Sequence, residues 1–531
     1  MLEKLHQSFL VILILFLFFI PVYNKFKWNH KEVTIGSDPQ IKYYQSFSFY
    51  KDGISKRNLE CYFPAEKLGF SLNYIPIGYP WAFVNSNHEC FFQYPILMPL
   101  LHALIGKLFN FNLVLYIPIF FFLLNFIISI KILQLFGLNF QKSIYLSLYI
   151  HFLTPIFLSS LDYSEVTLTN TFLLLTLFYY EKQKRNKVDI NLFQNLLCGL
   201  LIAVTFQLRP EVTISVIILF FVGFLFNFKQ FSSLRMYVSI GFFFLIFTIG
   251  ACYLNYTIYH HPLGMRGLNT IQDSQILMLN QYIQNWISDI WGSDFKIGII
   301  KAYPILFFLA LFGIFRSGIT KTYNHYLISG ITFLLLLPIL SPYRAGVDIM
   351  GLRYYESGVY LLSFGSLAII FKDLNITSRI SKIYLVVLIL FVLVSSYFGY
   401  KSNLRAIKHW AGAAKVSNEF SERITQLNPE IIIHRGLSTT YLMGVSYLKV
   451  PQIVIYSQKD WDDVEKTLVN RKLKRVLFLY WEGNHLVNDE FPSKIWKSAF
   501  DINFNLQTNR FWMRKEVSLI HFKGLLLEQE L

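Results

Sequence analysis

Charged residues are scarce in this chain: they make up 15% of 531 residues, while 54% are hydrophobic and 53 are Phe. A soluble protein of this size could not bury so much apolar surface, so an ordinary soluble fold is excluded. The four cysteines and twelve histidines show no spacing typical of a zinc site. Internal repeats, low-complexity tracts and polybasic tails are also missing. The +16 net charge therefore indicates membrane topology and contact with anionic lipids, and we expect no nucleic acid partner.

Long apolar runs are what the sequence has in abundance. The first, at 10–23, has no small-residue cleavage site after it, so we expect a retained anchor. The others are each close to the roughly 20 residues that cross a bilayer as a helix. These runs predict an α-helical polytopic membrane protein with about 11 transmembrane helices. The later runs lie at 111–130, 143–160, 164–180, 191–208, 211–227, 236–257, 297–315, 324–340, 354–371 and 383–400.

The charges of the short loops predict the orientation. With the N-terminus in the cytoplasm, the predicted inner loops carry 13 Lys and Arg, whereas the short outer connections carry three. This asymmetry satisfies the positive-inside rule for a multi-pass protein of the cell's inner membrane. The long segments 24–93 and 258–296 then lie outside. The run 94–109 would reverse all later loops if it crossed, but its prolines, His102 and Lys107 favour a helix lying at the interface.

The last quarter of the chain changes character. From residue 401, β-type runs at 431–434, 452–456 and 475–480 alternate with helical stretches such as 460–471. This pattern predicts a small C-terminal extracytoplasmic α/β domain at 401–531, beside a membrane domain at 1–400. Cys61 and Cys90 share the first outer segment, where the compartment permits a disulfide; a bridge and two free thiols both stay open.

Ionisable groups recur at the predicted outer membrane level, and each has a structural alternative. Asp38 soon follows the first span, but Asp before Pro also starts ordinary turns. Asp162 and Glu165 would share one helix face, although acidic residues also cap helices. Arg209 with Glu211 could be an interfacial anchor pair, and Arg353 a belt residue.

The recurrence of carboxylates and arginines together favours a functional site. Ionisable groups at membrane depth are costly and usually mark function. A carboxylate can accept the proton of a hydroxyl nucleophile, while the guanidinium fork matches phosphate oxygens. The combination indicates transfer of a group away from a lipid phosphate.

The order of these motifs resembles that of the C-type integral-membrane glycosyltransferases, which include protein O-mannosyltransferases and the bacterial aminoarabinose transferase. The resemblance covers most of residues 1–400 and rests on short motifs. These are the outer Asp38, Phe92-Gln93-Tyr94-Pro95, Ser164-Glu165, Leu208-Arg209-Pro210, Tyr259-His260-His261-Pro262-Leu263-Gly264-Met265-Arg266 and Leu352-Arg353-Tyr354.

The resemblance implies transfer of a sugar from a polyprenyl-phosphate donor to an extracytoplasmic acceptor, a cell-surface glycan, lipid or protein, with inversion. Asp38 would be the general base or acceptor-orienting carboxylate, with Asp162 or Glu165 as a second acidic group. Lipid-phosphate binding would fall to Arg209, Arg266, Arg353 and Tyr354.

One departure concerns the first loop. Many protein O-mannosyltransferases have two adjacent acidic residues there, whereas Ser37 and Pro39 flank Asp38. This difference argues against protein mannosylation and against a metal site of the oligosaccharyltransferase kind. We therefore expect no particular cofactor, and a divalent metal ion is the one candidate that stays open.

Two other function classes remain. A lipid or sugar transporter or flippase would place its charges near the midplane, often in broken helices, whereas these charges lie at helix ends. A non-catalytic assembly protein would use the C-terminal domain as its working part, but it would not need so many spans.

Overall fold

The structure is a computed structural model that describes part of the chain. The described residues are 2–28, 37–53, 61–78, 81–84, 89–185, 191–227, 231–265, 267, 279–293, 296–303, 310, 323–340, 349–372, 379–436, 444–481, 496–506 and 520–529. They form two compact units. The helical unit comprises Met1–Tyr23 and Tyr116–Ile407, and the mixed unit comprises Asn24–Leu115 and Lys408–Leu531. The separation into domains at 1–400 and 401–531 stays a prediction.

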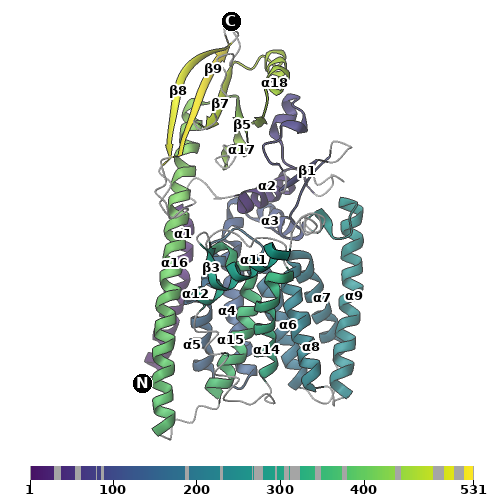
Figure 1. The fold of residues 1–531 in the computed structure, drawn as a ribbon, viewed down its shortest axis with the longest axis vertical. Helices are drawn as coiled ribbons and strands as arrows, with labels where there is room; N and C mark the ends of the chain where they lie inside the picture. The colour runs from purple at the N-terminus through teal and green to yellow at the C-terminus, as the bar shows by residue number, and fades with distance from the viewer. Residues whose placement is uncertain are drawn as a thin grey trace. The chain divides into compact units, whose positions relative to one another are not determined.

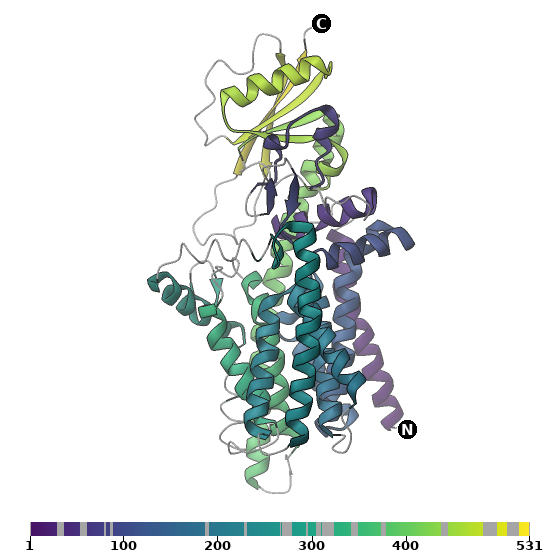
Figure 2. The same ribbon diagram turned by 90° about the vertical axis from the view of Figure 1, so that its right-hand side faces the viewer.

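The helical unit is built from helices that run side by side (Figures 1 and 2). Short 3-10 helices, η4 (Pro155–Ser160) and η5 (Ile349–Tyr355), precede α6 and α15. The helices are α1 (Leu2–Trp28), α4 (Ile117–Leu135), α5 (Phe140–Phe152), α6 (Val166–Arg185), α7 (Leu192–Leu208), α8 (Pro210–Asn227), α9 (Phe231–Tyr259), α11 (Leu279–Trp291), α12 (Ile299–Ala302), α14 (Asn324–Leu340), α15 (Glu356–Lys372) and α16 (Arg379–Leu427), whose last part belongs to the mixed unit.

Local sequence explains where several of these helices begin and how closely they pack. The Asn139 side chain accepts a hydrogen bond from the Lys142 amide and caps α5, and Asn191 caps α7 in the same way. A Cβ at Gly330 of α14 would lie 2.7 Å from the Leu362 amide nitrogen of α15. The glycine therefore allows these two helices to approach closely, as small residues do in membrane helix pairs.

The predicted spans are confirmed only in part. Within the described ranges, two helical stretches are long and apolar enough to cross a membrane, Phe111–Leu135 and Leu234–Tyr259. The run 143–160 is not one helix, because α5 ends at Phe152 and a separate 3-10 helix, η4, begins at Pro155 after its N-cap Thr154. Most of 297–315 lies outside the described residues. The number of about eleven spans therefore stays a prediction.

The mixed unit begins with the segment that was predicted as an outer loop. Much of it is ordered secondary structure: α2 (Ser37–Asp52), the 3-10 helices η1 (Pro64–Leu68) and η2 (Leu72–Tyr74), and a hairpin of β1 (Ala82–Val84) with β2 (Cys90–Phe92). Next come α3 (Leu97–Leu108) and η3 (Phe111–Tyr116). α3 falls in the run 94–109, and a helix of its length rises about 18 Å, too short to cross a bilayer core of about 30 Å.

The rest of the mixed unit is a five-stranded sheet in the order β6-β5-β7-β9-β8. β5 (Ile431–Arg435) pairs in parallel with β6 (Gln452–Ile455) and β7 (Arg475–Trp481), while β9 (Ile520–Gln529) runs antiparallel to β7 and to β8 (Trp496–Leu506). α17 (Ser446–Lys449) and α18 (Gln458–Asn470) connect the parallel strands. Trp461, Val464 and Leu468 of α18 are buried, and the Trp461 ring lies 6.1 Å from that of Phe478 in β7.

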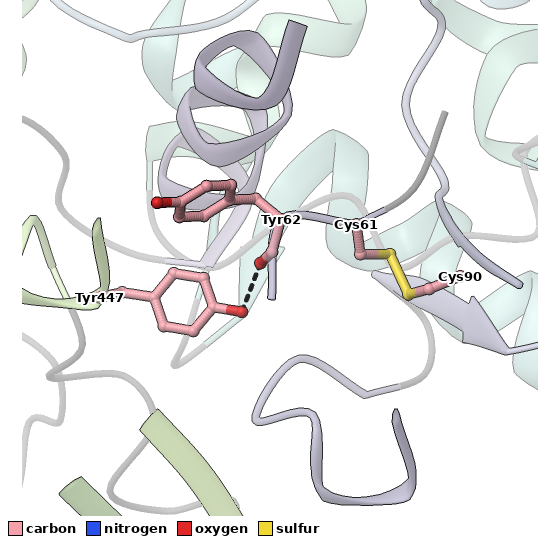
Figure 3. The surroundings of a disulfide bond; sticks show 4 residues. All are labelled: Cys61, Tyr62, Cys90 and Tyr447. Atoms are coloured by element: carbon pink, nitrogen blue, oxygen red, sulfur yellow. Dashed lines mark hydrogen bonds between the residues drawn. A yellow bond between two sulfur atoms is a disulfide. The ribbon is translucent and has the colours of Figure 1, made fainter. Parts of the chain in front are cut away.

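A disulfide joins Cys61 to Cys90 at the start of β2, which settles the question that the sequence left open (Figure 3). Next to it, the Tyr447 hydroxyl donates a hydrogen bond of 2.6 Å to the Tyr62 carbonyl (Figure 3). The disulfide therefore fixes the hairpin to the segment that meets α17 within the mixed unit.

Candidate functional site

Buried charges of the helical unit gather where several helices begin. Glu165 directly precedes α6, Glu211 lies in the first turn of α8, and Glu356 is the first residue of α15. The partial positive charge of a helix N-terminus favours a carboxylate at each of these positions. Two arginines, Arg209 and Arg353, lie among these carboxylates. We call Asp162, Glu165, Arg209, Glu211, Arg353, Tyr354 and Glu356 the polar cluster.

Arg209 lies in the short break between α7 and α8. Pro210 disfavours a helical conformation at the residue before it, so Arg209 has extended backbone angles and ends α7. Its side chain is 2% exposed. Nε donates a 2.7 Å hydrogen bond to Oε1 of Glu211, and Nη1 lies 4.0 Å from Oε1 of Glu165. A buried guanidinium with two carboxylates is largely committed to holding helix ends together.

Arg353 comes from η5 and is more accessible. Its Nη1 lies 3.3 Å from Oδ2 of Asp162, and its side chain is 13% exposed. The Tyr354 ring is close to both arginines: its centre is 4.7 Å from the Arg209 guanidinium carbon and 5.4 Å from that of Arg353. The next residue, Tyr355, donates a hydrogen bond to the Asp289 carboxylate of α11 and so holds η5 in place.

Glu356 belongs to the same cluster, although it was not among the predicted site residues. It is 2% exposed, and its carboxylate accepts hydrogen bonds from the Ser159 hydroxyl and, at 2.6 Å, from the Asn170 side chain. Its partners come from η4 and α6, far from it in the sequence. The one local signal is its place directly after Leu352-Arg353-Tyr354-Tyr355, at a predicted helix start.

A small cavity touches this cluster. Asp162, Arg353 and Glu356 line it together with Ser159 and apolar residues, and its volume is about 10 Å³. Such a volume is about enough for one water molecule with several polar partners. The cavity brings two predicted site residues, Asp162 and Arg353, next to the missed Glu356.

Asp38 lies in the mixed unit, in the first turn of α2 and not in an irregular turn. Its Oδ1 accepts hydrogen bonds from the Tyr94 hydroxyl at 2.6 Å and from Trp81 Nε1 at 3.1 Å. Lys42 lies 4.6 Å from the centre of the Tyr94 ring, and Gln45 donates to the Tyr94 carbonyl. Because Asp38, Lys42 and Gln45 share one face of α2, that face fixes the Asp38 carboxylate against Tyr94.

The structure thus brings together five of the predicted site residues in the helical unit: Asp162, Glu165, Arg209, Arg353 and Tyr354. Asp38 belongs to the mixed unit, and Arg266 lies outside the described residues. Across the described part of the chain, no group of three or more His, Cys, Asp or Glu is placed to hold a metal ion.

Comparison with solved structures identifies the fold. ArnT from Cupriavidus metallidurans, solved with undecaprenyl phosphate bound, matches with a TM-score of 0.51 over 98% of this chain and 97% of ArnT, at 11% identity. The chain has a C-type glycosyltransferase fold. This is a membrane-protein fold and agrees with the resemblance of the short motifs.

Other comparisons add less. The oligosaccharyltransferase AglB from Archaeoglobus fulgidus, solved with an inhibitory peptide and a dolichol-phosphate, matches 90% of this chain and 69% of AglB at 12% identity, with a TM-score of 0.47. No protein-family description matches the sequence, and no curated protein does.

Proposed function

We propose that this protein is a membrane glycosyltransferase that moves a sugar from a polyprenyl-phosphate donor to an extracytoplasmic acceptor with inversion. The observation that carries the proposal is the polar cluster, in which a buried and a half-buried arginine meet carboxylates at one end of the helices of a C-type glycosyltransferase fold. The ArnT structure was solved with undecaprenyl phosphate, the leaving group that this reaction would release.

Burial and charge assign different roles to the two arginines. Arg209 is 2% exposed and is held by Glu211 and Glu165, so it acts as a positioning residue that orders the Tyr354 ring and the helix starts. Arg353 is more exposed, at 13%, and lines the cavity beside Asp162. A guanidinium can contact two phosphate oxygens with its fork. We therefore propose that Arg353 binds the departing lipid phosphate.

Asp38 is assigned to the acceptor. Its Oδ1 atom accepts hydrogen bonds from the side chains of Trp81 and Tyr94, so the carboxylate has a fixed orientation. In the proposed step the acceptor hydroxyl gives its proton to Asp38 while its oxygen forms a bond to the anomeric carbon. The bond from that carbon to the phosphate oxygen breaks, and its electron pair leaves on the lipid phosphate. A positioned base contributes about 10² to 10⁴-fold to such a rate.

The remaining predicted acids do not need to exchange protons in this scheme. Asp162 orients Arg353, and Glu165 helps to hold Arg209, each through the ion pair described above. Removing one partner of a buried ion pair typically costs about 3–5 kcal/mol, because it leaves the other charge uncompensated. These two carboxylates are therefore positioning residues, and their loss is expected to harm folding together with activity.

The proposal can be tested with purified protein in lipid nanodiscs, incubated with radiolabelled polyprenyl-phosphate sugars and extracted membrane acceptors. Transfer of label to an acceptor, with release of unlabelled polyprenyl phosphate, is the expected result. The anomeric configuration of the product should be opposite to that of the donor. Retention of configuration, or movement of intact labelled lipid across the bilayer without release of phosphate, would refute the proposal.

A further inference from the structure

An apolar groove between α8 and α9 lies outside the polar cluster. Its volume is about 300 Å³, at the lower end of the roughly 300–1,000 Å³ of ligand pockets. Phe220, Phe221 and Phe224 of α8 and Tyr237, Ile240 and Gly241 of α9 form most of its walls. The Tyr237 hydroxyl is the one polar side-chain group among the residues lining the groove.

The groove depends on a glycine. A Cβ built on Gly241 would meet no atom within 4 Å beyond its own helix, so this position faces open space between aromatic walls. The contrast is Gly199 of α7, where a Cβ would lie 2.6 Å from the Phe243 side chain of α9. Gly199 allows α7 and α9 to pack closely, whereas the space beside Gly241 is large enough for a ligand.

One end of the groove leads to polar and basic residues. The Tyr237 hydroxyl lies 2.7 Å from the hydroxyl of Tyr180 in α6. One helical turn further along α6, Lys184 lies 6.0 Å from the Tyr180 ring centre. The last turn of α6 contains Lys182, Lys184 and Arg185. Lys182 to Arg185 lie about 26–30 Å along the helix from Glu165 and the polar cluster, at 1.5 Å per residue.

These features select one kind of occupant. The groove opens outward beside Ile217 and Phe221, whose side chains are 51% and 62% exposed, so in a bilayer it faces lipid tails. A water-soluble ligand would find too few polar partners between these walls. A lipid with an anionic headgroup would meet apolar walls along its tail and cations at its head, and basic residues at helix ends attract anionic lipids.

We propose that the apolar groove between α8 and α9 binds one acyl chain of an anionic phospholipid, whose phosphate is placed at the basic last turn of α6. The site is separate from the proposed sugar transfer, and it would anchor the lipid at the opposite end of α6 from the polar cluster. It does not depend on the identity of the donor.

The experiment measures phospholipid retention by native mass spectrometry after reconstitution of the full chain in nanodiscs of equal phosphatidylglycerol and phosphatidylcholine. Gly241→Phe should fill the groove and lower retained phospholipid about tenfold, because the buried methylenes lose their site. Gly250→Phe is the matched control, since Gly250 lies on the same helix with open space at its Cβ and outside the groove. The control should retain phospholipid as the wild type does.

Two further variants separate the tail from the head. Ile217→Trp narrows the groove from α8 and should also lower retention, which guards against misfolding of Gly241→Phe alone. The double variant Lys182→Gln and Arg185→Gln alters exposed cations only, and should lower the ratio of phosphatidylglycerol to phosphatidylcholine that is retained. An unchanged ratio would overturn the headgroup assignment. Wild-type protein that retains no phospholipid, or an isoprenoid lipid in its place, would overturn the whole proposal.

Discussion

At the scale of single residues, two arginines that both contact Tyr354 differ in burial and in their carboxylate partners. The ring lies close to both guanidinium groups, and the deeper one, that of Arg209, is held by Glu165, directly before α6, and by Glu211 of α8. Only Arg353 combines partial exposure with a place in the cavity wall. Its planar fork, and not only its charge, is what the proposed phosphate contact uses.

Arg353→Lys is therefore expected to impair sugar transfer although the charge is kept. A compact ammonium replaces the two-point contact by one, and a hydrogen bond between charged groups is worth about 1.5–3 kcal/mol, or roughly tenfold to a hundredfold in rate. Single-turnover transfer from a polyprenyl-phosphate sugar measures this loss. The control is Arg423→Lys on α16, an exposed residue outside the cluster. Equal transfer rates in the two variants would reduce Arg353 to a membrane-belt residue.

Asp38→Asn tests the proposed base. The amide keeps an oxygen that can accept from Tyr94 and Trp81, so α2 and the hairpin should keep their structure. The amide cannot take a proton from an acceptor hydroxyl, and transfer should fall by about 10² to 10⁴-fold. Initial transfer rates and donor binding are both measured, because binding should persist.

Asp52→Asn is the matched control for this variant. Asp52 is the last residue of the same helix, α2, and should tolerate the change with a small effect on transfer. Normal transfer by Asp38→Asn, or its failure to accumulate in the membrane, would make Asp38 a structural residue. The search for a base would then turn to Asp162 and Glu165.

Sequence reasoning reached the charged residues that stand out in short motifs, but it could not reach their partners. Glu356 resembles any acidic residue at a helix start, and nothing local shows that Ser159 and Asn170 will donate to it. Likewise, nothing in the sequence near Trp81 and Tyr94 shows that their side chains donate hydrogen bonds to Asp38 of α2. Long-range pairing, not residue type, was the missing information.

At the scale of elements, the β1-β2 hairpin depends on its disulfide. The Cys61–Cys90 bridge closes a segment with a sequence separation of 29. Closing a loop of this size is expected to stabilise the mixed unit by about 3–4 kcal/mol through the entropy of the unfolded chain. The double variant Cys61→Ser and Cys90→Ser should therefore lower the melting temperature of the mixed unit.

The measurement is thermal unfolding followed by intrinsic tryptophan fluorescence, with and without reductant. Cys252→Ser supplies the control, because Cys252 is a free cysteine in α9, and its unfolding should respond to reductant as the wild type does. A double Ser variant that melts at the wild-type temperature would show that hydrogen bonds alone hold the hairpin.

The sheet of the mixed unit contains a second sensitive element, the buried His434 of β5. Its ring nitrogen Nε2 lies 2.7 Å from the Gln452 side-chain oxygen of β6. Burial lowers the pKa of His434 from 6.5 to about 4. Because the unfolded chain binds this proton first, folding stability is full above pH 6.5 and falls as the pH drops toward 4.

The total loss across this range is about 3 kcal/mol for one histidine. Urea unfolding of the mixed unit, measured at steps between pH 7 and 4, tests this value. The variant His434→Gln should be less stable at pH 7 but should show a flatter dependence on pH. An identical pH dependence in both proteins would assign the acid sensitivity to other groups.

The elements of this sheet also show which patterns a sequence displays. β5, β6, β7 and α18 lie at or near their predicted ranges, because buried parallel strands are short apolar runs between helices. β8 and β9 were not predicted. Polar residues interrupt the apolar pattern of both, as in Lys497-Ser498 and Glu528-Gln529, and their pairing contains a register shift near Ser498. Such strands are defined by their partners more than by their own composition.

At the scale of the whole chain, the order of weak motifs predicted the fold better than any single motif could. Only 11% of residues are identical to ArnT, yet the two chains match over nearly their full lengths. Two of the apolar runs contain helices long and apolar enough to span a membrane, but the runs did not predict helix breaks such as the one between α5 and η4.

The remaining prediction at this scale is the orientation. The positive-inside bias places the end of α6 in the cytoplasm and the C-terminal sheet outside. Lys182→Cys and Lys466→Cys, both at exposed positions, should therefore react with a membrane-impermeant maleimide from opposite sides of the membrane. Cys61 and Cys90 are bridged and Cys198 is buried, so replacing Cys252 by Ser gives a quiet background. Labelling of both positions from one side would reverse part of the topology, and if that side were the cytoplasm, Asp38 would not share the acceptor's compartment.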